Sequence, residues 1–460
     1  MVEWLVAKLS YSVWFRKVFA TLPRLVVEAD PLVQRWIILQ AETAVYGKCG
    51  LAAYEAGESS ALRRLARRSL AQHLCQRALI GSVAINGLRR VVFGLALPVL
   101  LLLFVLSSLR SRKIPTLNSR PDLVVFFWSE RLYKFVEEAT FQGQTYVLHR
   151  DKRAYFGNQE IRFLMRAIAA CRRMLWYPEL LCNLARWLGY YGYVTTHYHP
   201  KTAVVHFFEG TVSSSLMTAY LHEKGLQHID VQHGEIMFVA TSAFCQFDEV
   251  RLWGEHFRRI VVSSHGPGGN VKVLGTRYHR DLFRRVRNQH RPRPQRLLII
   301  DPFLYEDQRV YGSVMEKVLG RLDAEWEVRV RRHPAELRRT LGWMQQLKSD
   351  PELVKRGIRM EEEPPTFPIE EALSKSRVVL GVASAALIEA WIVGCKVIHI
   401  AGGPCRSALM DRYQNSANVF YCDQNSDTQL LDKFLAEPAV LDESERAFVN
   451  YLTTIDEDVA

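Results

Sequence analysis

Residues 377–401 read RVVLGVASAALIEAWIVGCKVIHIA, and the prediction of the fold starts here. A short apolar run, RVVLGV, leads through small residues into the helical segment SAALIEAWIVG, and a second apolar run, KVIHIA, follows at once. Two apolar runs of strand length joined by a helix of about ten residues are typical of parallel strands with a crossover helix. The stretch therefore predicts a βαβ unit.

The same alternation of strand-like runs and helical segments occurs twice along the chain. From residue 121 the runs DLVVFFW, QTYVLHR, TAVVHFF, QHIDVQHGE and VKVLG appear in turn, and RLLIIDP and WEVRVRRHP resume the pattern after a basic, proline-bearing linker at 287–296. Doubly wound sheets bind ligands outside the carboxyl ends of their strands. We therefore predict an α/β protein with two doubly wound, Rossmann-like domains, 120–287 and 296–440, a tail at 441–460, and a ligand site in the cleft between the domains.

Residues 1–115 are expected to form a helical N-terminal region. Within it, 91–109 contains nineteen residues without a charge, VVFGLALPVLLLLFVLSSL, which is the threshold length for a membrane span. Basic residues flank both ends, against the usual asymmetry of membrane spans, and Pro98 lies in the middle. The segment is therefore either a buried core helix or a shallow membrane insertion. We favour a cytoplasmic protein that makes peripheral contact with the inner membrane at this segment.

Charge and cysteine content limit the function classes. A formal net charge of +12 indicates anionic partners, but the basic residues are dispersed and match no nucleic-acid recognition module, so we expect no nucleic-acid partner. Eight scattered cysteines without a CxxC pair are typical of a reducing compartment and argue against a disulfide framework or a zinc site. The absence of P-loop, GxGxxG and GxSxG motifs removes the usual support for ATPase, dehydrogenase and hydrolase functions.

Two polar clusters are interpreted as structural. His197, His199 and His206 in THYHPKTAVVH have no cysteine or carboxylate at ligand spacing, so we expect a surface turn before a strand and no metal site. The glutamates at 361–363 precede two prolines and are expected to form a solvated loop. We therefore predict neither a bound metal nor a cofactor.

Polar and small residues of the second half follow directly on predicted strands. The strand of WEVRVRRHP ends in two arginines and a histidine, and small residues open the helix after RVVLGV. Small residues let a ligand approach backbone N–H groups where the helix dipole favours an anion, although they also permit tight helix–sheet packing. Beside a strand that ends in RRH we favour the ligand interpretation, with Glu389 as an acceptor for ribose hydroxyls. The donor-binding candidates are Asp301, Arg331, Arg332, His333, Pro334, Ser384, Ala385 and Glu389.

The first half places carboxylates and an imidazole at two strand ends. VVHFFEG reaches Glu209 before a serine-rich helix start, and IDVQHGE ends with His233 and Glu235. Such groups at the mouth of a cleft are candidate general bases, because burial raises the pKa of a carboxylate towards neutrality. Each alone is more typical of a helix cap or a loop residue. Together they make Glu209, His233 and Glu235 the catalytic candidates, and the sequence does not decide which of them is the base.

With QHGE in the first half and RRHPAE and SAALIEA in the second, the chain resembles the GT-B glycosyltransferases that build bacterial surface polysaccharides, above all the capsule-type sialyl- and Kdo-transferases. The resemblance covers roughly residues 120–440. It places Phe208-Glu209-Gly210 at the acidic motif that provides the base, and His333-Pro334 at the motif that contacts the phosphate of a CMP-sugar. Ala383-Ser384 falls at a motif of small hydroxyl residues. The chain departs from this pattern at Phe208, where the family has an acid, and in having one serine where the family has two.

The resemblance implies an inverting glycosyltransferase of capsular polysaccharide or lipopolysaccharide biosynthesis. A CMP-sugar would donate a sialic acid-like or Kdo-like sugar to a glycan or glycolipid acceptor without a metal. Three alternatives stay open. The donor could be a UDP-sugar or CDP-glycerol. The protein could be a non-hydrolysing UDP-sugar 2-epimerase, although DPFLYEDQ stands where that class has a THRxEN-like stretch. It could also be a non-catalytic subunit of capsule assembly.

Overall fold

The computed structural model describes most of the chain between residues 31 and 440. The described residues are 31–80, 83–111, 120–126, 143–149, 153–207, 214–232, 240, 243–266, 270–287, 293–300, 308–332, 342–364, 367–382, 384–400, 416–440, 443, 447, 449 and 453. The chain divides into two compact units: unit 1 comprises Met1–His233, Phe238–Leu252 and Phe257–Leu274, and unit 2 comprises Gly234–Met237, Trp253–His256 and Gly275–Ala460.

Unit 1 contains a six-stranded parallel sheet with the order β2-β1-β3-β4-β5-β6. In its centre Val124 of β1 lies opposite Val147 of β2 and Val204 of β3. Every residue of β1 and β3 is buried, because a parallel sheet covered on both faces needs apolar side chains on both. The strands are β1 (Leu123–Phe126), β2 (Tyr146–His149), β3 (Ala203–His206), β4 (Gln227–Val231), β5 (Glu249–Leu252) and β6 (Val271–Val273).

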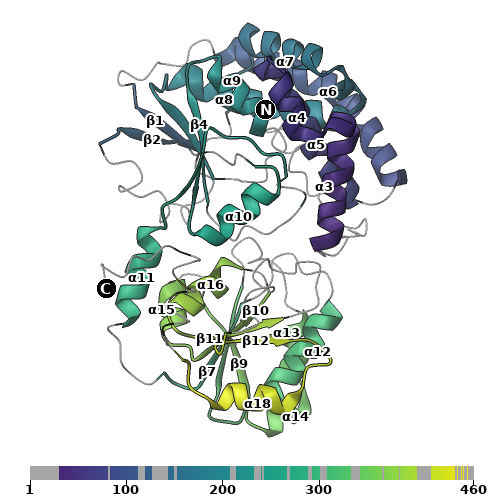
Figure 1. Cartoon of the computed structure of the whole chain (residues 1–460). Coiled ribbons are helices and arrows are strands. Elements are labelled where there is room, and N and C mark those ends of the chain that lie inside the picture. Colours follow the sequence, from purple (N-terminus) through teal and green to yellow (C-terminus); the bar gives the residue numbers. More distant parts are fainter. Residues whose placement is uncertain are drawn as a thin grey trace. The chain divides into compact units, whose positions relative to one another are not determined.

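The N-terminal helices of unit 1 pack onto the helices next to this sheet (Figure 1). Helix α5 contacts α9 and α7, and α6 runs along α8. Ile37 of α3 and Leu70 of α5 belong to the same buried cluster as Val124 and Val204 of the sheet, so the helical region and the sheet share one hydrophobic core. The helices are α3 (Pro31–Tyr46), α4 (Gly50–Gly57), α5 (Ala61–Ile80), α6 (Val83–Ser111), α7 (Asn158–Ala170), α8 (Pro178–His197), α9 (Ser214–His222) and α10 (Glu255–Ser263).

Unit 2 contains a second six-stranded parallel sheet, with the order β12-β11-β10-β7-β8-β9. The strands are β7 (Arg296–Ile300), β8 (Glu327–Arg331), β9 (Arg359–Glu362), β10 (Val378–Gly381), β11 (Lys396–Ile400) and β12 (Val419–Cys422). The helices are α11 (Arg277–Arg287), α12 (Gln308–Leu319), α13 (Gly342–Lys348), α14 (Pro351–Lys355), α15 (Ile369–Ser374), α16 (Ala385–Ile392) and α18 (Thr428–Ala436). The βαβ unit predicted for 377–401 is thus β10, α16 and β11.

The predicted fold class, two doubly wound domains of the GT-B type preceded by a helical region, is confirmed by these two sheets. Helices α7 and α8 and strands β9 and β12 were not predicted. Helix α11 ends at Arg287 and β7 begins at Arg296, the two bounds given to the predicted linker.

The sequence predicted a surface turn at THYHPKTAVVH, and only the residues between α8 and β3 form it. His197 is the last residue of α8, His206 is buried at the end of β3, and His199 between them is exposed with a positive φ of 46°. Among the described residues, no group of three or more His, Cys, Asp and Glu side chains is placed to hold a metal ion.

The uncharged segment 91–109 lies inside α6, which continues through Pro98 as one helix. One face of α6 packs on α8, and Leu97, Leu100 and Leu101 contact the core of unit 1. In the part of the chain that the structure describes, no helix has both the length and the hydropathy needed to cross a membrane.

The glutamates at 361–363 are not a solvated loop, as the sequence suggested, but belong to the edge strand β9 and the residue after it. Each is paired with one arginine at an N–O distance of 2.5–2.7 Å: Glu361 with Arg329 of the adjacent strand β8, Glu362 with Arg332 directly after β8, and Glu363 with Arg296 of β7. Opposite charges on adjacent strands stabilise their pairing. An acidic run can therefore pair into this sheet because the arginines beside it neutralise its charge.

We expect Glu363→Ala to lower the free energy of unfolding by about 3 kcal/mol, because both Glu363 and Arg296 are buried and the change leaves a buried guanidinium without its nearest carboxylate. Urea unfolding followed by tryptophan fluorescence measures this loss. The matched control is Glu361→Ala, whose carboxylate is largely exposed in the same strand and should cost less than about 1 kcal/mol. Equal losses in the two variants would contradict the argument from burial.

Candidate functional site

The carboxyl edge of the second sheet brings together residues that are far apart in the sequence. Ile300 of β7 lies opposite Arg331 of β8, and Gly381 of β10 lies opposite His399 of β11. Because β7 pairs in parallel with both β8 and β10, these strands end next to one another. This is the edge at which doubly wound sheets bind ligands.

The two arginines at the end of β8 have different partners. Arg331 Nη1 donates to the carbonyl oxygen of Phe367 at 2.9 Å. Arg332 forms a bidentate pair with Glu362, in which Nε lies 2.7 Å from Oε1 and Nη2 donates to Oε2 at 2.7 Å. A bidentate pair fixes the plane of the guanidinium as well as its position. A phosphate bound at Arg332 would therefore share this cation with Glu362.

Ser384 caps the N-terminus of α16. Its Oγ accepts a hydrogen bond from the N–H of Ala386 at 3.3 Å, as an N-cap serine does. Ala385 is the first residue of the helix, so the positive end of the α16 dipole lies at the carboxyl edge of the sheet. Two of the predicted donor-binding residues thus form the start of a helix that can attract an anion.

Gly381 is small because the helix packs closely on the sheet. A Cβ at this position would lie 3.3 Å from Ile300 Cβ and 3.3 Å from Leu387 Cδ2, which is tighter than ordinary van der Waals contact. The packing interpretation considered for the small residues of this stretch therefore holds for Gly381. It does not account for the cap at Ser384.

Glu389 is buried on α16, and its carboxylate faces a tyrosine that the sequence analysis did not single out. Tyr278 of α11 is also buried, and its hydroxyl interacts with the carboxylates of Glu389 and of Glu370 on α15. Burial and these two carboxylates raise the pKa of Tyr278 far above its usual value, so the phenol stays protonated and can donate. The packing of α11 on α16 brings these residues together, and no local pattern in the sequence predicts this.

Six of the predicted site residues lie outside the described part of the chain: Glu209, His233, Glu235, Asp301, His333 and Pro334. Their roles stay predictions. The other five are Arg331, Arg332, Ser384, Ala385 and Glu389, and all of them belong to unit 2. Within that unit the ends of β8 and β10, separated by β7, bring the two arginines and the α16 N-terminus to the same edge of the sheet.

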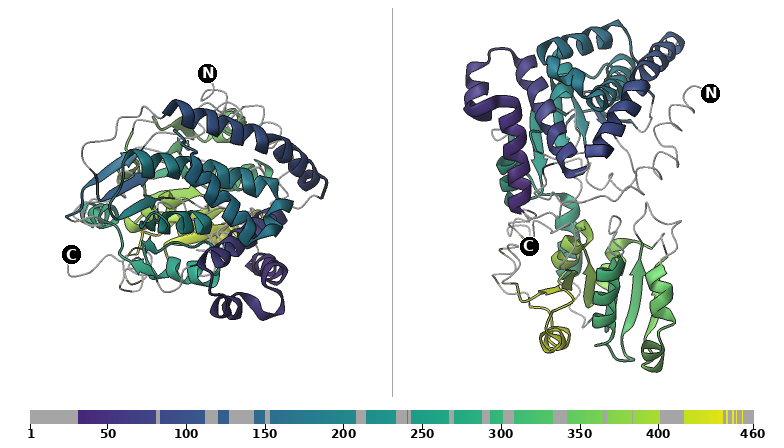
Figure 2. Two further views of the ribbon diagram at one scale, coloured as in Figure 1. Left: turned by 90° about the horizontal axis from the view of Figure 1, so that it is seen from above. Right: turned by 90° about the vertical axis from the view of Figure 1, so that its right-hand side faces the viewer.

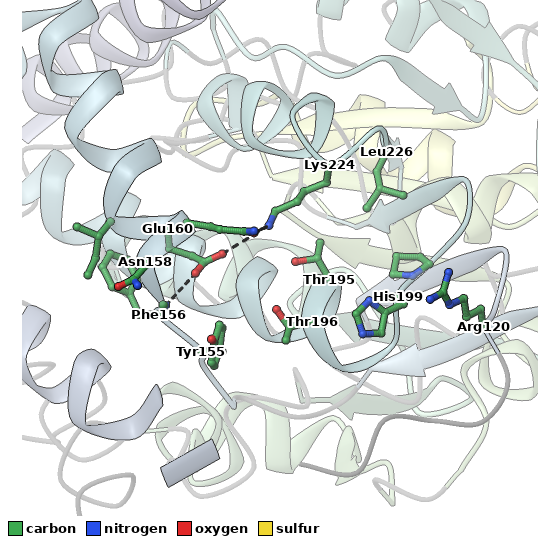
Figure 3. Close-up of a pocket in the computed structure, with 14 residues that line it drawn as sticks. Arg120, Tyr155, Phe156, Asn158, Glu160, Thr195, Thr196, His199, Lys224 and Leu226 are labelled. Atoms are coloured by element: carbon green, nitrogen blue, oxygen red, sulfur yellow. Dashed lines mark hydrogen bonds and ion pairs between the residues drawn. The ribbon is translucent and has the colours of Figure 1, made fainter. Parts of the chain in front are cut away.

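A cavity of about 630 Å³ lies at the other end of the first sheet (Figure 3). It is formed where α8 ends, where α7 begins and where the chain enters β4. Its polar lining includes Arg120, Asn158, Glu160, Thr195, His199 and Lys224. The cavity is therefore at the amino ends of the strands, not at the carboxyl edge where the sequence predicted a site.

Two charged side chains of this cavity, Glu160 and Lys224, already have partners within the protein. Glu160 accepts hydrogen bonds from the Gly157 N–H at 2.8 Å and from the Tyr220 hydroxyl at 2.6 Å, and it lies 4.0 Å from Lys224 Nζ. Lys224 also donates to the side-chain oxygen of Gln159. The carboxylate serves as the capping residue of α7, so we give the cavity no part in the chemistry.

Comparisons with known proteins give similarities of structure only. No family model and no curated protein sequence matches the chain. The UDP-GlcNAc 2-epimerase of Methanocaldococcus jannaschii aligns with 71% of this chain and 98% of its own, at 11% identity and a TM-score of 0.45. The UDP-GlcNAc 2-epimerase of Neisseria meningitidis aligns with 72% and 96%, at 13% identity and 0.45. The wall teichoic acid polymerase TagF aligns with 81% and 93%, at 10% identity and 0.42. At such identities no site residue can be transferred to this chain.

His399, at the carboxyl edge, gives unit 2 a defined response to pH. Burial lowers its pKa from 6.5 to about 4, so the folded protein holds the imidazole neutral while the unfolded chain binds a proton below about pH 6.5. The stability from this group is therefore present above pH 6.5 and is lost as the pH falls towards 4, by at most about 3 kcal/mol.

We expect the melting temperature of His399→Gln to fall less steeply than that of the wild type between pH 6.5 and 4. Calorimetry of both proteins over this pH range measures the difference between their melting temperatures. Carboxylates that titrate in both proteins affect both melting temperatures equally and therefore do not contribute to this difference. As a control, His222→Gln should leave the slope between pH 6.5 and 4 unchanged, because Asp248 at 2.7 Å raises the pKa of His222 and the stability from that pair is lost only as the pH rises above 6.5. Parallel pH curves for His399→Gln and wild type would contradict the prediction.

Proposed function

We propose that this protein is an inverting GT-B glycosyltransferase that moves a sialic acid-like or Kdo-like sugar from a CMP-sugar to a bacterial surface polysaccharide or glycolipid. The observation that carries the proposal is the carboxyl edge of the second sheet. There β8 ends in Arg331 and Arg332, β10 leads into the Ser384 cap of α16, and β7 between them is the strand that Asp301 follows in sequence. Cations and a helix N-terminus at one sheet edge suit the phosphate of a nucleotide.

Each donor-side residue has a defined part in this proposal. Arg331, Arg332 and His333, with the α16 N-terminus at Ser384 and Ala385, stabilise the negative charge that develops on the departing nucleotide phosphate. Glu389 accepts hydrogen bonds from the ribose hydroxyls, and Tyr278 holds its carboxylate in place. Asp301 and Pro334 line the rest of the binding site for the nucleotide-sugar donor.

The acceptor side supplies the base. Glu209, Glu235 or His233 removes the proton from the acceptor hydroxyl as its oxygen attacks the anomeric carbon. The bond from that carbon to the phosphate oxygen breaks on the opposite face, so the configuration inverts and the nucleotide leaves as an anion. Peripheral contact with the inner membrane, at its cytoplasmic face, belongs to the same proposal, because a glycolipid acceptor lies in that membrane.

A nucleotide panel tests the proposal. Among CMP, CDP, UDP and GDP, we expect CMP to give the largest rise in melting temperature, because a ligand at 100 times its Kd adds about 2.7 kcal/mol to the folded state. His333→Ala should abolish the rise, whereas His222→Ala, at an exposed histidine of unit 1, should keep it. A larger shift with UDP would rule out the CMP-sugar assignment. No shift with any of the four would rule out a nucleotide-sugar enzyme, and isomerisation of a UDP-sugar without an acceptor would identify an epimerase.

The buried Tyr278 allows a sharper test of the ribose contact. We expect Tyr278→Phe to weaken CMP binding about tenfold, because the change removes the buried phenol beside the Glu389 carboxylate that we assign to the ribose. Binding of 2′-deoxy-CMP should change little, so titration calorimetry with both nucleotides should show their Kd values converging. The control is Tyr311→Phe, which removes a buried hydroxyl 3.5 Å from the Ile300 carbonyl oxygen in the same unit. Equal weakening of both nucleotides would show that Tyr278 acts only on the fold.

A further inference from the structure

Helix α6 has one face inside the protein and one face outside. Its inner face packs along α8, and Leu97, Leu100 and Leu101 contact the core of unit 1. The view from above shows α6 as the long dark blue helix at the rim of unit 1 (Figure 2, left). The outer face carries an apolar stripe, and its members are 42–73% exposed: Val91, Leu95, Val99, Leu102 and Leu106.

The stripe is continuous along the helix. Its members follow one another at intervals of four, four, three and four residues, which places them on one side of an α-helix over a length of about 22 Å. Contiguous apolar patches of this kind are rare on soluble monomers and mark interaction surfaces. The other side of α6 packs on α8, whereas this stripe is exposed to solvent.

The charge around the stripe identifies the kind of partner. Residues 59–121 contain eleven Lys and Arg and no Asp or Glu, in a chain that otherwise has 48 acidic residues among 460. Some arginines of α5 are paired with glutamates from other segments, as Arg68 is with Glu55. Nevertheless, every charged residue that flanks the stripe in the sequence is basic. These residues are Arg89, Arg90, Arg110, Arg112 and Lys113.

A second copy of this chain is a poor partner for the stripe. It would bring an identical basic fringe against the first, and like charges repel. An anionic phospholipid surface offers acyl chains to the apolar stripe and phosphates to the basic residues that flank the stripe in sequence.

We infer that α6 docks this protein on an anionic phospholipid bilayer, lying in the plane of the surface with Val91, Leu95, Val99, Leu102 and Leu106 immersed. This inference rests on the membrane contact in the proposed function and names its docking face and its lipid class. A helix held along its length by α8 presents one face to the lipid and keeps the other in the protein core. The flanking arginines then contact headgroup phosphates.

Co-sedimentation of the full chain with vesicles tests the inference. We expect the wild type to bind vesicles that contain phosphatidylglycerol at least tenfold more tightly than vesicles of phosphatidylcholine alone. The double variant Leu95→Gln/Leu102→Gln should lose at least tenfold of that binding. The matched control is Val354→Gln/Leu430→Gln, which replaces two exposed apolar residues of unit 2 and should bind as the wild type does. Circular dichroism melting checks that both variants are folded.

Three results would overturn the inference: no binding of the wild type to phosphatidylglycerol vesicles, equal binding of the stripe variant and the wild type, or loss of a dimer in the stripe variant without any vesicle binding. The assay contains no nucleotide. Failure of α6 to bind lipid therefore leaves the nucleotide shifts of the donor site unaffected, and failure of those shifts leaves the lipid result standing.

Discussion

Parallel strand pairing is the constraint on which the described structure depends. A parallel neighbour cannot be reached by a tight turn, so the chain must cross back over the sheet, usually through a helix, before the next strand begins. The same constraint aligns the carboxyl ends of all strands at one edge. In unit 2 this aligns the end of β8 with the start of α16, although about fifty residues separate them in the sequence. The candidate donor site is a direct result of this geometry.

The second sheet adds an electrostatic condition to the parallel pairing. Arg296, Arg329 and Arg332 come from β7 and β8 or directly follow them, and three consecutive glutamates, two in the edge strand β9 and one directly after it, neutralise them. One pair is buried, one is largely exposed and one lies at the ligand edge. The same type of interaction therefore serves the core, the surface and the candidate site within three consecutive residues. At the ligand edge it also means that Glu362 competes with any anion for Arg332.

The sequence predicted those parts of the fold that depend on hydrophobic pattern. Buried strands such as β1, β7 and β10 are continuous apolar runs, and they were found. The strand β9 was missed because its glutamates are polar, and their arginine partners come from strands that only the tertiary fold places beside them. The candidate site divides in the same way. Ser384 and Glu389 were named as candidates because a small-residue helix start is a local signal. Tyr278 lies beside Glu389 through the packing of α11 on α16, which no local pattern encodes.

The shared core of unit 1 has a consequence for any attempt to separate lipid binding from folding. The inner leucines of α6 pack against the buried cluster that includes strands of the first sheet, so the helix with an exposed outer face also covers part of the domain core. Removing it would expose the side of α8 on which it packs. The membrane contact that we infer for α6 and the integrity of the domain would thus depend on the same 29-residue helix, and selection on either one would restrict the other.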